Sequence, residues 1–167
     1  SPLYVNDALE YASYYLAVKA DNHYRQALHA DSLGNQVEAT QQLNRSVEIL
    51  LAVDKLLASH PLYRLDEWVD RAREWGETDK EKDAYEANAK RLITTWGGFQ
   101  EDYAARFWSG LIKDYYIPRM KLYFSEQRAD LDRWEENWIK TPWHNTSTAF
   151  DDPLQSAIEW VVRCKEE

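Results

Sequence analysis

The sequence has few of the residues that interrupt secondary structure or build disulfide and metal sites. Its 167 residues include five glycines, five prolines and a single cysteine, Cys164. One cysteine cannot form an internal disulfide or supply a cysteine-rich metal site. A fold of many short strands needs more turn residues, and no segment alternates apolar and polar residues over a convincing length. The chain is therefore expected to form long helices.

Long apolar runs and an excess of positive charge are also missing. The 20 lysines and arginines against 29 aspartates and glutamates give a formal net charge of −9, which repels a phosphate backbone. No apolar run approaches the roughly 20 residues that span a bilayer. Residues 1–5 lack the charged and apolar regions of a signal peptide. We therefore expect neither nucleic acid nor a membrane as a partner.

Residue types that carry catalysis or hold metals do not gather into a motif. The sequence has no Gly-x-Ser-x-Gly elbow, no phosphate-binding glycine loop and no His-x-x-x-His pair on one helix face. Its abundant carboxylates occur where solvated helix faces would place them. We expect no metal and no cofactor. The four histidines, His23, His29, His60 and His144, are spread over separate elements, and His29 and His60 are interpreted as surface or capping residues.

Helical periodicity dominates the chain, with apolar residues recurring every three to four positions. An all-α fold is predicted, an antiparallel helical bundle of about six to eight helices in one domain over residues 1–167. The first helix is predicted to begin at Asn6 or Asp7 and to end near Gly34, and a second begins close to Asn35. These two long helices form an N-terminal hairpin in which each covers the apolar face of the other.

Shorter helices are predicted further along the chain. Thr78 and Glu81 have the spacing of a capping box, which begins a helix. Gly76 is expected to end the preceding helix in a left-handed conformation. Asp102 or a neighbour is predicted to begin another helix. Pro118 marks either a kink or a new helix start, because a proline inside a helix removes a backbone hydrogen bond.

The stretch from Trp96 to Tyr103 combines flexible backbone with large flat side chains. The glycine pair Gly97–Gly98 breaks the helix, so the neighbouring aromatic side chains can point away from the core. An indole and a phenol form a flat wall with a polar edge, which suits the apolar C–H face of a sugar ring. Core packing is the alternative for both aromatic residues. Asp102 either caps a helix or contacts a ligand.

A series of short motifs follows one another in order along the chain: Leu50–Ser59, Trp68–Arg73, Glu81–Ala89, Leu92–Gly97, Asp102–Ala104, Trp108–Leu111 and Tyr115–Arg119. Together they resemble the C-terminal helical domain of alpha-N-acetylglucosaminidases, glycoside hydrolase family 89. The resemblance covers nearly the whole chain. Each motif alone is modest, but the ordered set is fairly specific.

This resemblance implies an exo-acting hydrolase that removes terminal alpha-linked N-acetylglucosamine with retention of configuration, through two glutamates. In that family both glutamates lie on a central (β/α)8 barrel, which this chain does not contain. The chain would then be a fragment without activity of its own. Its partners would be the catalytic barrel upstream in the parent chain and the terminal N-acetylglucosamine of a glycan. Such a protein would be secreted or periplasmic in a bacterium and lysosomal in an animal.

The resemblance also implies which residues face the sugar. Trp96, Tyr103 and Gln100 are the predicted substrate contacts, and Asp102 and Gly97 are predicted to be cap or pocket residues. The alternative is a stand-alone helical module that binds a carbohydrate or a protein without catalysis. Such a module would bind its ligand by itself, whereas a detached enzyme domain would show little affinity of its own.

Overall fold

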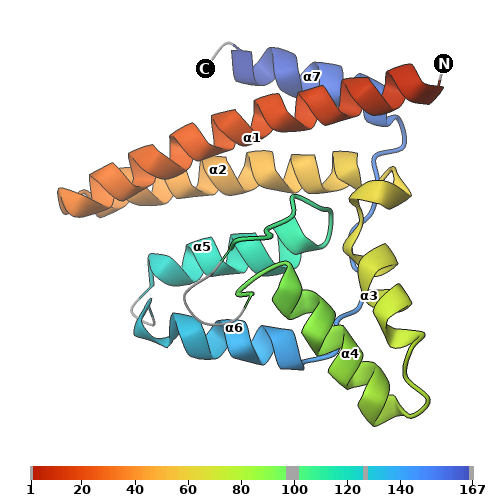
Figure 1. The fold of residues 1–167 in the computed structure, drawn as a ribbon. Helices are drawn as coiled ribbons and strands as arrows, with labels where there is room; N and C mark the ends of the chain where they lie inside the picture. The colour runs from red at the N-terminus through yellow and green to blue at the C-terminus, as the bar shows by residue number, and fades with distance from the viewer. Residues whose placement is uncertain (1, 97–101, 126–127, 166–167) are drawn as a thin grey trace. The chain divides into compact units, whose positions relative to one another are not determined.

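The protein is all-α over the residues that its computed structural model describes, which are 2–96, 102–125 and 128–165. The predicted all-α fold with a long N-terminal hairpin is confirmed. By contact, the chain divides into two compact units, Ser1–His60 with Ser147–Glu167, and Pro61–Thr146. The α-helices in Figure 1 are α1 (Pro2–Ser32), α2 (Gln36–Leu57), α3 (Leu65–Arg73), α4 (Asp79–Leu92), α5 (Ile117–Tyr123), α6 (Leu131–Lys140) and α7 (Pro153–Lys165).

The first unit is built on the long helical hairpin. α1 runs antiparallel to α2, and α7 lies along α1 (Figure 1). The turn between α1 and α2 contains Gly34, whose φ of +74° is a left-handed conformation that glycine adopts without strain. Asn35 then caps α2, because its side chain accepts a hydrogen bond from the amide of Glu38 at 3.2 Å. Aliphatic residues fill the interior: Leu9, Leu16, Ala20, Ala27, Ala39, Leu43, Val47, Ile49, Val53 and Leu56.

The first helix begins earlier than predicted. It starts at Pro2, so Asn6 and Asp7 lie inside α1 and do not cap it. Proline suits the first turn of a helix, because the amide hydrogen that it lacks would have no partner there. Asn and Asp are common caps, but their position in the sequence alone does not distinguish a cap from an interior position.

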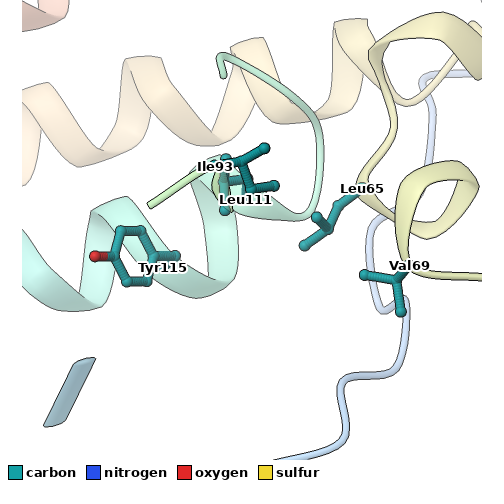
Figure 2. Close-up of a cluster of buried hydrophobic side chains, with 5 residues drawn as sticks. All are labelled: Leu65, Val69, Ile93, Leu111 and Tyr115. Carbon is teal, nitrogen blue, oxygen red and sulfur yellow. The ribbon is translucent and has the colours of Figure 1, made fainter. Parts of the chain in front are cut away.

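The second unit encloses a small apolar core. Figure 2 shows five of its buried residues, with Leu65 and Val69 on α3, Ile93 just after α4, and Leu111 and Tyr115 on the helical run that leads into α5. Half-buried aromatic residues pack against this cluster: Trp108, Tyr116, Trp134, Trp138 and Trp143. Aromatic side chains therefore surround a core that is itself mostly aliphatic.

The connection between α3 and α4 contains the predicted capping box. The side chain of Thr78 accepts a hydrogen bond from the amide of Glu81 at 3.3 Å, and the Glu81 carboxylate accepts one from the amide of Thr78 at 3.0 Å. The prediction for Gly76 is wrong, because it does not adopt the left-handed conformation. Its lack of a side chain serves packing instead, since a Cβ there would lie 2.5 Å from the amide nitrogen of Lys82.

The helix predicted to begin near Asp102 does not form. Residues 102–104 make a turn, and residues 105–108 are irregular. Ser109 pairs with the chain beside α3: its amide donates to the carbonyl of Tyr63 at 2.8 Å, and its carbonyl accepts from the amide of Leu65 at 3.0 Å. Backbone hydrogen bonds to a distant segment thus replace those of a local helix.

Pro118 lies within a continuous helical run rather than at a new start. A π-helix, Ile112–Tyr116, leads directly into α5. In a regular α-helix the proline ring would clash with the carbonyl of Asp114, four residues earlier. The wider π-turn is a common way to accommodate such an interruption.

Candidate functional site

The structure brings two of the predicted contacts together at the end of α4. The ring centroids of Trp96 and Tyr103 are 5.5 Å apart, and the ring planes are inclined by 59°. Tyr103 is 76% exposed and Trp96 is half-buried, so core packing does not explain the tyrosine. The pair presents flat apolar surface together with an exposed phenol, which is the combination expected of a ligand-binding wall.

The backbone of this turn adopts uncommon conformations. Trp96 and Asp102 have φ angles of +55° and +59°, in the left-handed region that costs a residue with a side chain about 1–2 kcal/mol. The amide of Asp102 donates to the carbonyl of Thr94 at 2.9 Å, which fixes the turn against the end of α4. Gly97 and Gln100, the other predicted contacts of this turn, lie outside the described residues. Strained backbone of this kind is concentrated at functional sites.

The side chain of Asp102 pairs with a cation and does not cap a helix. Its Oδ2 accepts a hydrogen bond from Nη1 of Arg119 at 2.9 Å. The Nε of the same guanidinium lies 2.6 Å from Oε1 of Glu135 on α6. The hydroxyl of Tyr115 donates to this Oε1 at 3.0 Å. A chain of charge-assisted contacts therefore connects the turn at Asp102 to the interior of the second unit.

Two residues in this chain of contacts, Glu135 and Tyr115, are buried, which restricts their movement. Only 4% of Glu135 is exposed, and Tyr115 is fully buried. A buried carboxylate needs a paired charge and hydrogen bonds, which Arg119 and Tyr115 supply. Sequence reasoning did not identify these three residues as part of the site. One signal was available: Glu135 lies on the same helix face as Leu131 and Ile139, where an ionisable side chain is unexpected.

Burial also determines the protonation of the two neighbouring phenols. It raises the pKa of Tyr115, to which the charge of Glu135 adds, and it raises the pKa of Tyr116 to about 12, with a contribution from Asp102. For Arg119, burial lowers the pKa, but the contacts with Asp102, Tyr115 and Glu135 outweigh it and raise the pKa overall. At neutral pH both phenols are therefore neutral hydrogen-bond donors and the guanidinium is charged.

The arrangement is suited to holding and orienting a ligand. Asp102 and Glu135 are both bound to Arg119, so they support the turn and are poorly placed to act as an acid and a base. Among the described residues, no three histidine, cysteine, aspartate or glutamate side chains gather where they could hold a metal ion. In the same part of the chain, no helix is both long and apolar enough to cross a membrane. Trp96 and Tyr103 remain the predicted ligand contacts.

Comparison with known sequences identifies relatives. Residues 1–161 match the family model of the alpha-N-acetylglucosaminidase (NAGLU) C-terminal domain. A stretch of 78 residues is 38% identical to human alpha-N-acetylglucosaminidase, and it covers 46% of this chain and 10% of the human protein. The matched region is thus a small part of that relative.

Comparison with solved structures finds the same fold. A family 89 glycoside hydrolase from Clostridium perfringens, in complex with 2-acetamido-1,2-dideoxynojirmycin, matches 99% of this chain with a TM-score of 0.81 and 24% sequence identity. A second Clostridium perfringens structure, in complex with its substrate GlcNAc-alpha-1,4-galactose, matches 100% of this chain with the same TM-score and identity. In each case the chain covers 21% of the solved protein.

Proposed function

Because the chain belongs to the family of alpha-N-acetylglucosaminidase C-terminal domains, we propose that it forms one wall of the substrate pocket of a larger glycoside hydrolase. The substrate is a glycan that ends in alpha-linked N-acetylglucosamine. The catalytic barrel of the same parent chain is the structural partner. The observation that carries the proposal is the exposed aromatic pair, Trp96 and Tyr103, on a turn with strained backbone.

Trp96 and Tyr103 are the surface against which the terminal sugar packs. The C–H face of the ring gains dispersion contacts from the aromatic planes. The Tyr103 hydroxyl can donate to or accept from a sugar hydroxyl or the N-acetyl group. Asp102 adjoins this tyrosine, and its ion pair with Arg119 limits movement of the turn. Gln100 and Gly97 lie between these two aromatic residues in the sequence, and we propose them as further contacts of the sugar.

Hydrolysis itself is assigned to the barrel. A retaining glycosidase uses two carboxyl groups about 5–5.5 Å apart, one as nucleophile and the other as acid and base. The two carboxylates that contact Arg119 are Asp102, which adjoins Tyr103, and the buried Glu135; both support the turn, and neither is assigned to the chemistry. The isolated chain is therefore inactive. Its contribution is orientation of the sugar, which can account for a large part of the reduction in the reaction barrier.

The proposal is tested by replacing each of the two aromatic side chains with alanine in the full-length parent enzyme. We expect Trp96→Ala or Tyr103→Ala to lower kcat/KM for an aryl alpha-N-acetylglucosaminide by about fivefold, because each removes an aromatic contact worth about 1 kcal/mol. Tyr11→Ala is the matched control, since Tyr11 is also 76% exposed but lies on α1 in the other unit. It should leave kcat/KM unchanged.

An unchanged kcat/KM in both Trp96→Ala and Tyr103→Ala would contradict the pocket assignment. A loss of equal size in Tyr11→Ala would also contradict it, since the effect would then come from exposed aromatic residues in general. Circular dichroism of each variant separates loss of binding from loss of folding.

A further inference from the structure

The segment from Asp102 to Arg106, which carries Tyr103, is held at both ends by one helical run. At its start, Oδ2 of Asp102 accepts a hydrogen bond from Nη1 of Arg119 at 2.9 Å. At its end, the carbonyl of Arg106 accepts one from the hydroxyl of Tyr116, also at 2.9 Å. We call this stretch the Tyr103 segment. Its backbone is therefore fixed on each side of the exposed tyrosine.

The two side chains that hold the Tyr103 segment lie on one face of that run. Tyr116 is the last residue of the π-helix and has α-helical backbone angles, and Arg119 follows three positions later in α5. Residues at this spacing are neighbours on a helix surface. A π-turn is rare and occurs frequently at functional sites. The helical run is thus suited to a task beyond packing.

Both of these side chains are themselves held against the interior of the second unit. The ring of Tyr116 is half-buried and meets the ring of Tyr115 edge-on, with centroids 5.4 Å apart. The guanidinium of Arg119 lies 5.8 Å from the centre of the Tyr115 ring, and its Nε lies 2.6 Å from the buried carboxylate of Glu135. Packing of this kind restricts the rotamers that Tyr116 and Arg119 can adopt.

Tyr103 itself has little packing that could fix its position. Its side chain is 76% exposed, and its ring contacts that of Trp96 at a centroid distance of 5.5 Å. An exposed side chain follows the backbone that carries it, because few neighbours restrict it. The orientation of the phenol therefore depends on how firmly the Tyr103 segment is held.

We propose that Tyr116 and Arg119 are positioning residues, which hold Tyr103 where it meets the terminal sugar. They act through the backbone of the Tyr103 segment and not on the sugar itself. The inference rests on the proposed function, in which Tyr103 is a substrate contact. Small displacements of a group that orients a substrate lower turnover, because the reacting atoms must be aligned closely.

The test uses two conservative variants of the full-length parent enzyme. Tyr116→Phe removes the hydroxyl and keeps the ring. Arg119→Lys keeps a positive charge beside the buried Glu135, but a lysine lacks the fork that contacts two carboxylates at once. Each variant should lower kcat/KM for an aryl alpha-N-acetylglucosaminide by about threefold, since each weakens one of the two attachments of the Tyr103 segment.

Arg73→Lys is the matched control. Arg73 is 30% exposed and contacts two carboxylates, the half-exposed Asp83 and the buried Glu86. Arg119 is 25% exposed and has the same combination of partners. Arg73→Lys should loosen the second unit to a similar extent but leave kcat/KM within about 1.5-fold of the unmodified enzyme. An equal loss of kcat/KM in this control would overturn the inference.

A double-mutant cycle separates positioning from general stabilisation. In an enzyme that already carries Tyr103→Ala, neither Tyr116→Phe nor Arg119→Lys should lower kcat/KM further, because the side chain that they position is gone. A further threefold loss in that background would show that the two residues act independently of Tyr103, and it would overturn the inference.

Hydrogen exchange provides a readout that does not depend on the substrate. The amide of Asp102 donates to the carbonyl of Thr94 at 2.9 Å, and the amide of Ala105 donates to the carbonyl of Asp102 at 3.1 Å. Exchange of these amides, measured by mass spectrometry on the full-length enzyme, should be faster in Tyr116→Phe and Arg119→Lys than in Arg73→Lys. Unchanged exchange in both variants would overturn the inference.

Failure of the inference can be told apart from failure of the proposed function. If Tyr103→Ala lowers kcat/KM and neither Tyr116→Phe nor Arg119→Lys does, the positioning role is wrong and the substrate contact stands. If Tyr103→Ala leaves kcat/KM unchanged, the substrate contact is wrong and a positioning role in catalysis falls with it. Hydrogen exchange then still decides whether Tyr116 and Arg119 hold the Tyr103 segment.

Discussion

The two units differ in what they bury. The first fills its interior with aliphatic side chains along α1 and α2, and its buried polar residues in the described part of the chain are Ser13, Ser46 and Asp54. The second unit has a small apolar core surrounded by half-buried aromatic residues, and its buried polar residues include Glu86, Lys90 and Glu135. The candidate site belongs to the second unit. Charged groups there connect segments that are far apart in the sequence.

Glu86 illustrates how the second unit is held together. Its carboxylate accepts from Nη1 of Arg73 at 2.6 Å and from the amide of Trp143 at 2.5 Å, and it lies 3.0 Å from Nζ of Lys90. Lys90 also donates to the carbonyls of Trp138 and Thr141 at the end of α6. Burial lowers the pKa of Lys90, an effect that its contact with Glu86 opposes. One buried ion pair thus joins α3, α4 and the chain after α6.

The largest expected effect follows from breaking this pair. Glu86→Gln leaves the ammonium of Lys90 buried without its counter-charge, which should lower the free energy of unfolding by about 3–5 kcal/mol. Urea denaturation measures it. The counterpart in the first unit is Glu48, which is 45% exposed and contacts Arg45 and Arg163 at 2.6 and 2.8 Å. Glu48→Gln should cost less than about 1 kcal/mol. Equal losses of unfolding free energy in Glu86→Gln and Glu48→Gln would contradict the proposed difference between a buried and an exposed ion pair.

Two glycines, one in each unit, allow a second comparison of the units, with an expected change in unfolding free energy of intermediate size. Gly34 in the first unit and Gly110 in the second both have positive φ angles, +74° and +85°. A Cβ at Gly34 meets nothing within 4 Å, whereas a Cβ at Gly110 would lie 2.7 Å from the ring of Trp143. The indole cannot easily shift, because its Nε1 donates to Asp114 at 2.9 Å.

Alanine substitution should therefore have unequal costs at the two glycines. Gly34→Ala should cost about 1 kcal/mol of unfolding free energy from backbone strain alone. Gly110→Ala should cost about 3 kcal/mol, since overpacking against Trp143 adds to that strain. Thermal or urea denaturation of the two variants provides the measurement. Similar costs would mean that packing around Trp143 is looser than the structure implies.

The smallest expected effect concerns an exposed carboxylate of the second unit. Hydrogen bonds from Arg91 and Lys140 lower the pKa of Glu136 to about 2. A lowered carboxyl pKa stabilises the folded state above the unfolded value near 4.5, and this contribution disappears as the pH falls toward 2. Because Glu136 is 39% exposed, Glu136→Gln should cost under about 1 kcal/mol at pH 7.

The pH dependence distinguishes this effect from a change in packing. The difference in unfolding free energy between Glu136→Gln and the unmodified chain should narrow steadily between pH 5 and pH 2. A difference that stays constant over this range would show that the ion pairs are not its source. Glu48→Gln in the first unit should behave in the same way, because Arg45 and Arg163 lower the pKa of Glu48 despite its partial burial.

Most of the fold was predictable where the determining interactions are local. The hairpin follows from apolar spacing along α1 and α2, and the capping box at Thr78 and Glu81 joins residues three positions apart. The segment after Asp102 was predicted wrongly, because its backbone bonds to Tyr63 and Leu65, about 45 residues earlier. No periodicity in the sequence reports such a pairing.

The candidate site likewise has a part that the sequence predicted and a part that only the structure revealed. Glycine beside aromatic residues identified Trp96 and Tyr103, and the structure places their rings together. The residues that support this turn were only partly predictable. Glu135 shares a helix face with Leu131 and Ile139, which is a sequence signal, but Arg119 resembles an ordinary member of a solvated helix face. Only the structure shows that Arg119 contacts both Asp102 and the buried Glu135.

The sequence by itself determined the helical class, the long hairpin, the capping box at Thr78 and Glu81, and the aromatic character of the turn after α4. These features depend on backbone hydrogen bonds and side-chain spacing within a few residues of each other. Tertiary structure alone decided that Asp102 pairs with Arg119 and that Glu86 and Lys90 are buried together. Those outcomes depend on charges far apart in the chain, whose interaction depends on distance and burial.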